Sequence, residues 1–164
     1  MGRECGGCTV CCYIGGVPEL KKPPHHACPH VTAKGCGIYG QKIRPKTCNT
    51  FRCAWLRGIG SEDDRPDKSG VMLATHGTPR GLVGFAIEAK PFALRRSGLN
   101  AVVEFARESK LPVIASDYKS KPPNDTGDYV IVLDELAERC HRIIDESTRY
   151  RLADDVCMYL RTEP

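Results

Sequence analysis

The sequence predicts an α+β protein, in which an irregular cysteine-rich N-terminal half packs on a small layer of strands with two helices. Eight of the ten cysteines fall within the first 53 of 164 residues, in a stretch rich in Gly and Pro that lacks helical or strand periodicity. From residue 71 onward, short apolar runs alternate with amphipathic stretches, which is typical of a small α+β layer. We therefore divide the chain into a cysteine-rich module (1–57), a polar linker (58–70) and a small α+β region (71–164), or one compact domain overall.

The α+β region begins with two runs typical of strands. VMLAT (71–75) and GLVGFAIEA (81–89) are rich in apolar and β-branched residues, so the residues between them are expected to form the turn of a hairpin. Ser97 is expected to cap a helix that continues to about Ser109. Its apolar stripe would consist of Leu99, Val102, Val103 and Ala106.

The remainder of the chain repeats this order. LPVIAS and DYVIVLD predict two more strands, separated by the loop KSKPPNDTG. Asp134 is then expected to cap a second helix, and a short tail would follow it. The apolar stripe of this helix would contain Leu136, Ala137, Cys140, Ile143 and Ile144.

The crowded cysteines indicate metal chelation, because thiolates two or three residues apart can close on one ion or cluster without strain. The alternative is a disulfide framework, which is typical of secreted chains that cannot build an adequate core. The opening MGRECGGC has no signal-peptide pattern, and no later run is long enough to span a membrane. We therefore expect a cytoplasmic protein with reduced thiols, no membrane partner, and a metal-chelating module in residues 1–57.

The charge of the first 60 residues agrees with this interpretation. Nine Lys and Arg residues stand against Glu4 and Glu19, which gives this part a net charge of +7. Basic surfaces often bind nucleic acid, but no aromatic-interleaved basic stripe accompanies the charge, so we do not favour a nucleic-acid partner. Eight thiolates on two divalent ions would lower the charge to about +3. The basic residues are thus expected to balance an electron-rich site.

The spacing of the cysteines does not select the metal. C-x2-C-x2-C equals the first three positions of a bacterial ferredoxin run, and Cys28-Pro29 could supply the fourth, but sixteen residues intervene where that run has three. Zinc could equally use Cys5 and Cys8 together with a distant pair such as Cys48 and Cys53. Zinc and iron, the latter also as an iron-sulfur cluster, both remain open.

The adjacent Cys11 and Cys12 add a constraint. Neighbouring side chains point in different directions, so these two sulfurs would not share one mononuclear ion comfortably. Either each serves a different site, or one binds metal and the other packs. Two four-ligand centres, or one cluster with packing thiols, are both compatible with the sequence.

A family resemblance rests on several segments in order. They are CGGCTVCC, VPELKKP, ACPH, GCGIYGQKIRPKTCNTFRCAWL and DRPDKSGVML, which together span about residues 4 to 73. This pattern resembles the CxxCxxCC proteins, also called the YkgJ-type cysteine cluster or zinc- or iron-chelating domain. A related cluster occurs in the much longer flagellin lysine methylases. The resemblance implies a metal-ligand role, but no reaction, for Cys5, Cys8, Cys11, Cys12, Cys28, Cys36, Cys48 and Cys53.

Two functions follow as hypotheses. The favoured one is a cysteine-ligated metal-binding protein whose ion or cluster organises the N-terminal half and offers a surface, or metal, to a protein partner. The alternative is an iron-sulfur redox or protein-modifying enzyme whose α+β region binds the substrate. The sequence specifies neither a small-molecule substrate nor catalytic residues, and it contains no P-loop, nucleophile elbow or H-E-x-x-H motif.

The remaining polar and aromatic candidates have less specific patterns. His25, His26 and His30 surround Cys28 and could supply nitrogen ligands, although a solvated loop explains them equally well. His76 is expected in a turn. Three aromatic residues are expected to cover the metal site, two arginines to balance thiolate charge or bind an anion, and two late cysteines to act as small apolar side chains. These are Tyr39, Phe51 and Trp55, Arg44 and Arg52, and Cys140 and Cys157.

Overall fold

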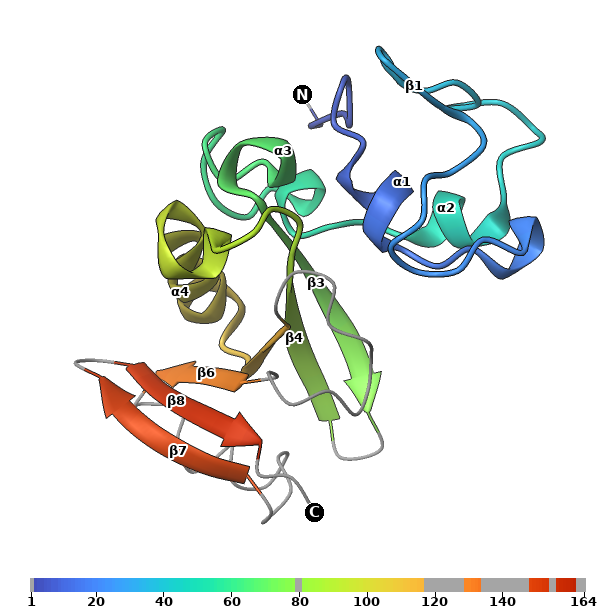
Figure 1. The fold of residues 1–164 in the computed structure, drawn as a ribbon. Coiled ribbons are helices and arrows are strands. Elements are labelled where there is room, and N and C mark those ends of the chain that lie inside the picture. The colour runs from blue at the N-terminus through green and yellow to red at the C-terminus, as the bar shows by residue number, and fades with distance from the viewer. Residues whose placement is uncertain (1, 79–80, 117–128, 134–147, 154–155, 162–164) are drawn as a thin grey trace.

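The computed structural model describes residues 2–78, 81–116, 129–133, 148–153 and 156–161 (Figure 1). Within these ranges the chain has four α-helices and two sheets, one with two strands and one with six. The predicted α+β class is therefore confirmed. No helix in the described ranges is long and apolar enough to cross a membrane.

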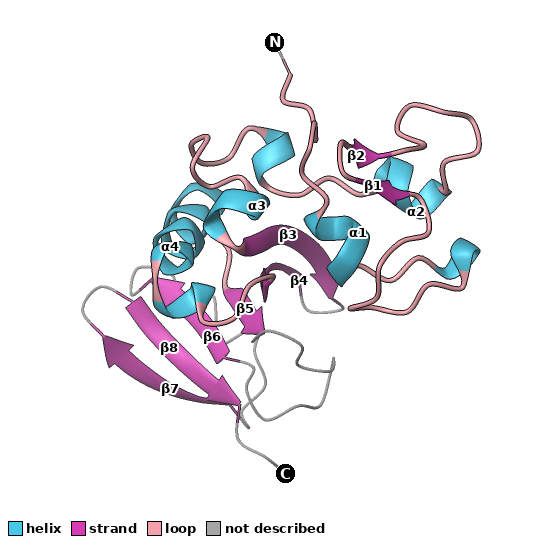
Figure 2. Cartoon of the chain, turned by 45° about the horizontal axis from the view of Figure 1, so that its top comes forward, coloured by secondary structure: helices cyan, strands magenta, loops and turns pink. Residues whose placement is uncertain are grey.

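The cysteine-rich half consists of short elements joined by loops (Figure 2). Helices of one turn or slightly more cannot show helical periodicity, which explains why the sequence predicts only an irregular chain here. A side chain at Gly35 would collide with the carbonyl oxygen of Gly6, so glycine allows the first loop to lie against the small hairpin. The elements are α1 (Val10–Ile14), η1 (Pro18–Leu20), β1 (Val31–Thr32), β2 (Gly35–Cys36), α2 (Lys46–Thr50) and η2 (Trp55–Arg57).

The larger sheet begins with the predicted hairpin. Strands β3 (Val71–Thr78) and β4 (Gly81–Glu88) pair antiparallel, and the register runs from Val71 opposite Glu88 to Thr78 opposite Gly81. His76 therefore lies within β3 opposite Val83, and its ring meets Phe85 edge-on at 5.6 Å. The turn expected at His76 is wrong, because strand pairing continues two residues past it.

Helix α4 (Ser97–Ser109) connects β4 to the parallel strand β5 (Val113–Ser116), as the sequence predicts. Ser97 is the first helical residue rather than the cap, since Arg96 occupies the N-cap position. The helix follows the short α3 (Pro66–Ser69) and η3 (Ala93–Arg95) in the chain.

The C-terminal part of the sheet differs from the prediction. β6 (Tyr129–Leu133) matches DYVIVLD, but the expected tail is a strand pair, β7 (Thr148–Ala153) and β8 (Val156–Arg161). Alternating basic and apolar residues in TRYRLA favour such a strand. The predicted helix after Asp134, with Cys140, lies outside the described residues. The full strand order is β3-β4-β5-β6-β8-β7.

The main core lies between α4 and the sheet. Phe105 and Val102 are almost completely buried, whereas Leu99 is 36% exposed, so the inward face of α4 is centred one residue away from the predicted stripe. Phe105 packs against Gly84, and the Cβ atom of any larger residue at this position would lie 2.6 Å from the Phe105 ring. Glycine on β4 thus makes room for the largest side chain of the core.

A second apolar cluster joins the cysteine-rich half to the hairpin. Ile14, Cys53 and Trp55 pack with Met72, while the adjacent Leu73 belongs to the main core. Successive residues of a strand face opposite sides of the sheet, so β3 is covered by α4 on one face and by the cysteine-rich half on the other.

Candidate metal centre

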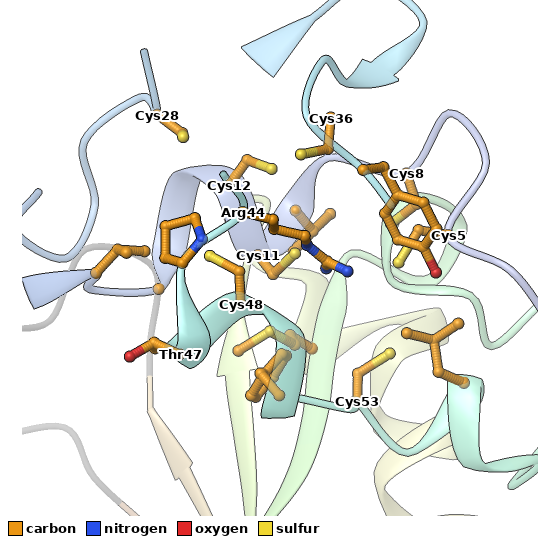
Figure 3. Close-up of a pocket in the computed structure, with 18 of the residues that line it drawn as sticks. Cys5, Cys8, Cys11, Cys12, Cys28, Cys36, Arg44, Thr47, Cys48 and Cys53 are labelled. Carbon is orange, nitrogen blue, oxygen red and sulfur yellow. The ribbon is translucent and has the colours of Figure 1, made fainter. Parts of the chain in front are cut away.

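All eight cysteines of the first half line one cavity of about 130 Å³ (Figure 3). None of them forms a disulfide. Much of the remaining lining is apolar, and Arg44 is the only charged residue among the described residues that line it. The structure thus brings together the complete set of predicted ligands, namely Cys5, Cys8, Cys11, Cys12, Cys28, Cys36, Cys48 and Cys53.

Local turns place the first cysteines at this cavity. The Cys8 amide donates to the Cys5 carbonyl at 2.9 Å, which closes a tight turn around Gly6 and Gly7. Gly6 has a φ of 51°, a conformation that glycine adopts at little cost. The turn brings two cysteines to the cavity just before α1 begins.

Elements that are distant in the sequence supply the other cysteines. Cys11 and Cys12 lie on α1, and the Cys28 amide donates to the Cys12 carbonyl at 2.9 Å. Cys36 is on β2, Cys48 is on α2, and Cys53 follows α2 in the second apolar cluster. Convergence therefore depends on long-range packing of the first half.

Burial keeps several of these thiols protonated. It raises the pKa of Cys5 and of Cys8 to about 11, and it is also the main cause of the raised pKa values of Cys48 and Cys53. Neighbouring thiols add to the effect, because two thiolates at close range repel each other. A cation is needed to make this set of donors ionise together.

The adjacent pair on α1 behaves differently. A hydrogen bond between the Cys11 and Cys12 side chains raises the pKa of Cys11, which burial raises further. The same hydrogen bond lowers the pKa of Cys12. Within this pair Cys12 ionises first, with the Cys11 thiol donating to its sulfur.

Arg44 brings positive charge to the cavity. Its guanidinium carbon lies 4.4 Å from the centre of the Tyr39 ring, and its Nε has no hydrogen-bond partner in the part of the chain that the structure describes. The guanidinium lies among the cysteine side chains in Figure 3. Its charge acts to lower the pKa values of Cys5 and Cys48, in opposition to burial.

Trp55 covers one side of the cavity, as the sequence predicts. It is 6% exposed, and the guanidinium carbon of Arg3 lies 5.1 Å from its ring centre. Arg3 also donates hydrogen bonds of 2.6 to 3.0 Å to the carbonyls of Trp55, Ile59 and Gly60. Sequence reasoning missed this anchor, which fixes the chain just before Cys5. Phe51 also lines the cavity, whereas Tyr39 lines it but is 40% exposed.

Two more charged residues near the cysteines were missed. Lys22 is 6% exposed, and its ammonium donates to carbonyls at the end of α1, including those of Tyr13 and Gly15. Burial lowers the pKa of Lys22, while the neighbouring thiols oppose that change. Asp67 accepts two hydrogen bonds from Arg65 at 2.7 and 2.8 Å and also interacts with the Cys8 thiol. Nothing in their sequence spacing marks either residue.

The sulfurs surround the cavity without converging on one point. Among the described residues, no three His, Cys, Asp or Glu side chains are close enough, as they stand, to hold a metal ion. His25, His26 and His30 are not part of the described cavity lining, and the His26 ring nitrogen Nδ1 lies 2.9 Å from the Pro24 carbonyl. The donor set itself suits zinc or iron-sulfur chemistry, because soft thiolates select these centres.

Searches with protein-family models, among curated proteins and among solved structures find no match to this chain. The resemblance to the CxxCxxCC proteins therefore stays a prediction from the motif.

Proposed function

We propose that this chain is a cysteine-ligated metal-binding protein that holds zinc or iron, the latter also as an iron-sulfur cluster. The observation that carries the proposal is the shared cavity. Four separate stretches of the chain, residues 5–12, 28, 36 and 48–53, contribute its eight cysteines, and every cysteine between residues 1 and 60 reaches it. Packing alone does not require thiols in particular, because other small apolar side chains fill such positions equally well.

The electrostatics of the cavity support a cation as the ligand. Neutral thiols are weak ligands, and a bound divalent ion would convert them to thiolates and release their protons. The resulting negative charge would face Arg44, the charged residue of the lining. A metal bound here would satisfy the donors and the guanidinium together.

The small elements of the first half support a structural role for the metal. Its described helices span five residues or fewer, too short to be stable alone. Zinc binding supplies about 10 to 16 kcal/mol in small cysteine-ligated peptides. We therefore propose that metal binding provides much of the folding free energy of residues 1–57.

The test is elemental analysis and a visible spectrum of protein purified without oxygen. Bound zinc or iron in the wild type, reduced in Cys8→Ser but retained in Cys157→Ser, would support the proposal. Cys157 is the matched control because it lies in β8, which β5 and β6 separate from the β3–β4 hairpin in the sheet. Wild-type protein that binds neither metal, even after reduction and reloading, would refute it. Brown protein with acid-labile sulfide would select the iron-sulfur form, and colourless zinc protein the other.

A further inference from the structure

Two buried N–H donors at the cavity have no hydrogen-bond partner among the described residues. The described part of the chain has three buried side-chain nitrogen or oxygen atoms without a partner, and two of them belong to residues that line the cavity. They are the indole Nε1 of Trp55 and the guanidinium Nε of Arg44. Buried polar groups in folded proteins are nearly always hydrogen-bonded, so each exception calls for an explanation. Two such donors at one cavity indicate that a hydrogen-bond acceptor belongs there.

The indole of Trp55 lies among apolar and sulfur-containing side chains. The residue is 6% exposed and forms the second apolar cluster with Ile14, Cys53 and Met72. Among the described residues, none of the side chains that form this cluster or pack against it carries an oxygen atom. An indole N–H can only donate, so it needs an acceptor. Sulfur is the acceptor that the neighbouring side chains offer.

Two arginines hold the indole ring in place. The guanidinium carbons of Arg3 and Arg65 lie 5.1 Å and 5.8 Å from the centre of the Trp55 ring. Arg3 also donates to three backbone carbonyls, and Arg65 donates twice to the carboxylate of Asp67, so both cations are fixed by other partners. The ring cannot turn its N–H out to water without losing these cation–π contacts.

Metal binding would turn the sulfurs of this cluster into strong acceptors. Cys53 is a member of the cluster and Cys11 packs against it, and both are proposed metal ligands. A neutral thiol is a weak acceptor, whereas a thiolate accepts a charge-assisted hydrogen bond. The sulfurs do not converge on one point in this structure, so the hydrogen bond would form as the ligands close on the metal.

We propose that the indole N–H of Trp55 donates a hydrogen bond to a metal-bound thiolate of the second apolar cluster, that of Cys11 or Cys53. The inference rests on the proposed function, because the metal holds these sulfurs as thiolates. Trp55 is then a positioning residue for the metal centre. Its N–H contributes to the stability of the metal-bound protein and not to that of the apo-protein.

An isosteric replacement tests the role of the N–H. Trp55 is the only tryptophan of the chain, so protein can be produced with benzothienylalanine at this position alone. This analogue keeps the shape of the indole ring and has a sulfur atom in place of the N–H. In competition with a chelator under nitrogen, the replacement should weaken zinc binding about tenfold, as loss of a hydrogen bond to a metal ligand does. The urea midpoint of the apo-protein should not fall, because the N–H has no acceptor there.

The indole proton provides a second readout that does not depend on a variant. A single tryptophan gives a single indole N–H resonance in the proton NMR spectrum, and Trp55→Phe identifies this resonance by removing it. Zinc loading of reduced wild-type protein should move the resonance downfield and slow the exchange of the proton with deuterium. Both changes are expected when a free N–H gains a charged acceptor.

The outcomes separate this inference from the proposed function. Equal zinc affinity in the wild type and the benzothienylalanine protein, or an indole resonance that zinc leaves unchanged, would overturn the inference and leave metal binding intact. A lower urea midpoint in the benzothienylalanine apo-protein would also overturn it, because Trp55 would then act through packing. Wild-type protein that binds no zinc after reduction and reloading would refute the proposed function together with the inference.

Discussion

A zinc ion bound by four cavity thiols whose pKa values are raised should release about four protons at pH 7.5. Burial raises the pKa of Cys5 and of Cys8 to about 11, and the pKa values of Cys11 and Cys53 are raised as well. A thiol with a pKa near 11 is ionised in about one molecule in three thousand at pH 7.5. Each of these thiols must therefore lose its proton when it binds zinc.

The magnitude follows from linkage. Four released protons make the zinc association constant rise by about four powers of ten per pH unit between pH 6.5 and 7.5. Calorimetric titration of zinc into reduced apo-protein, repeated in buffers of different ionisation enthalpy, counts the protons directly. Fewer than two protons per zinc ion would refute the argument that burial keeps these thiols neutral.

Three further predictions follow. Apo-protein should lose stability as the pH rises from 9 to 11, because the folded state raises the pKa values of Cys5 and Cys8 from the ordinary 9.0 to about 11. The stabilisation from these neutral thiols is complete below pH 9 and is lost as the pH approaches 11. It amounts to about 1 kcal/mol for each thiol after allowance for partial exposure. Urea unfolding at each pH measures it, and a constant midpoint would contradict it. Arg44→Ala should weaken zinc binding about tenfold in competition with a chelator, with Arg44→Lys intermediate and Arg107→Ala on the α4 surface unchanged. Equal affinities in all three would exclude an electrostatic role. Phe105→Ala should lower the free energy of unfolding by about 3 to 5 kcal/mol, measured in urea, and a loss below 1 kcal/mol would contradict the packing described for α4.

The sequence predicts the α+β region better than the cysteine-rich half, for a physical reason. The apolar runs of β3 and β4 and the long α4 show their periodicity directly. His76 was predicted in a turn, but its strand continues through polar residues to Thr78. The inner face of α4 includes Phe105, whose ring fits beside Gly84, whereas Leu99 is partly exposed. The strand pair near the C-terminus was missed although β7 alternates basic and apolar residues.

The members of the candidate site could be predicted from their clustering, but the contacts that bring them together could not. Cys28 joins Cys12 through a backbone hydrogen bond across fifteen intervening residues, and no local pattern encodes such a contact. The same holds for Arg3, which donates hydrogen bonds to the carbonyls of Trp55 and Ile59. These partners depend on the path of the loops through space.

If the chain binds metal as proposed, the two-sided cover of β3 would connect metal binding with exposure of the hairpin. Met72 relies on the cysteine-rich half for shelter from water, whereas Leu73, its immediate neighbour, relies on α4. If residues 1–57 unfold when the metal is removed, the core between α4 and the sheet can persist. The opposite face of the hairpin would then expose apolar side chains such as Met72 to water. Metal-free protein would then self-associate through this exposed apolar face, and aggregation of partly folded chains would accompany metal depletion.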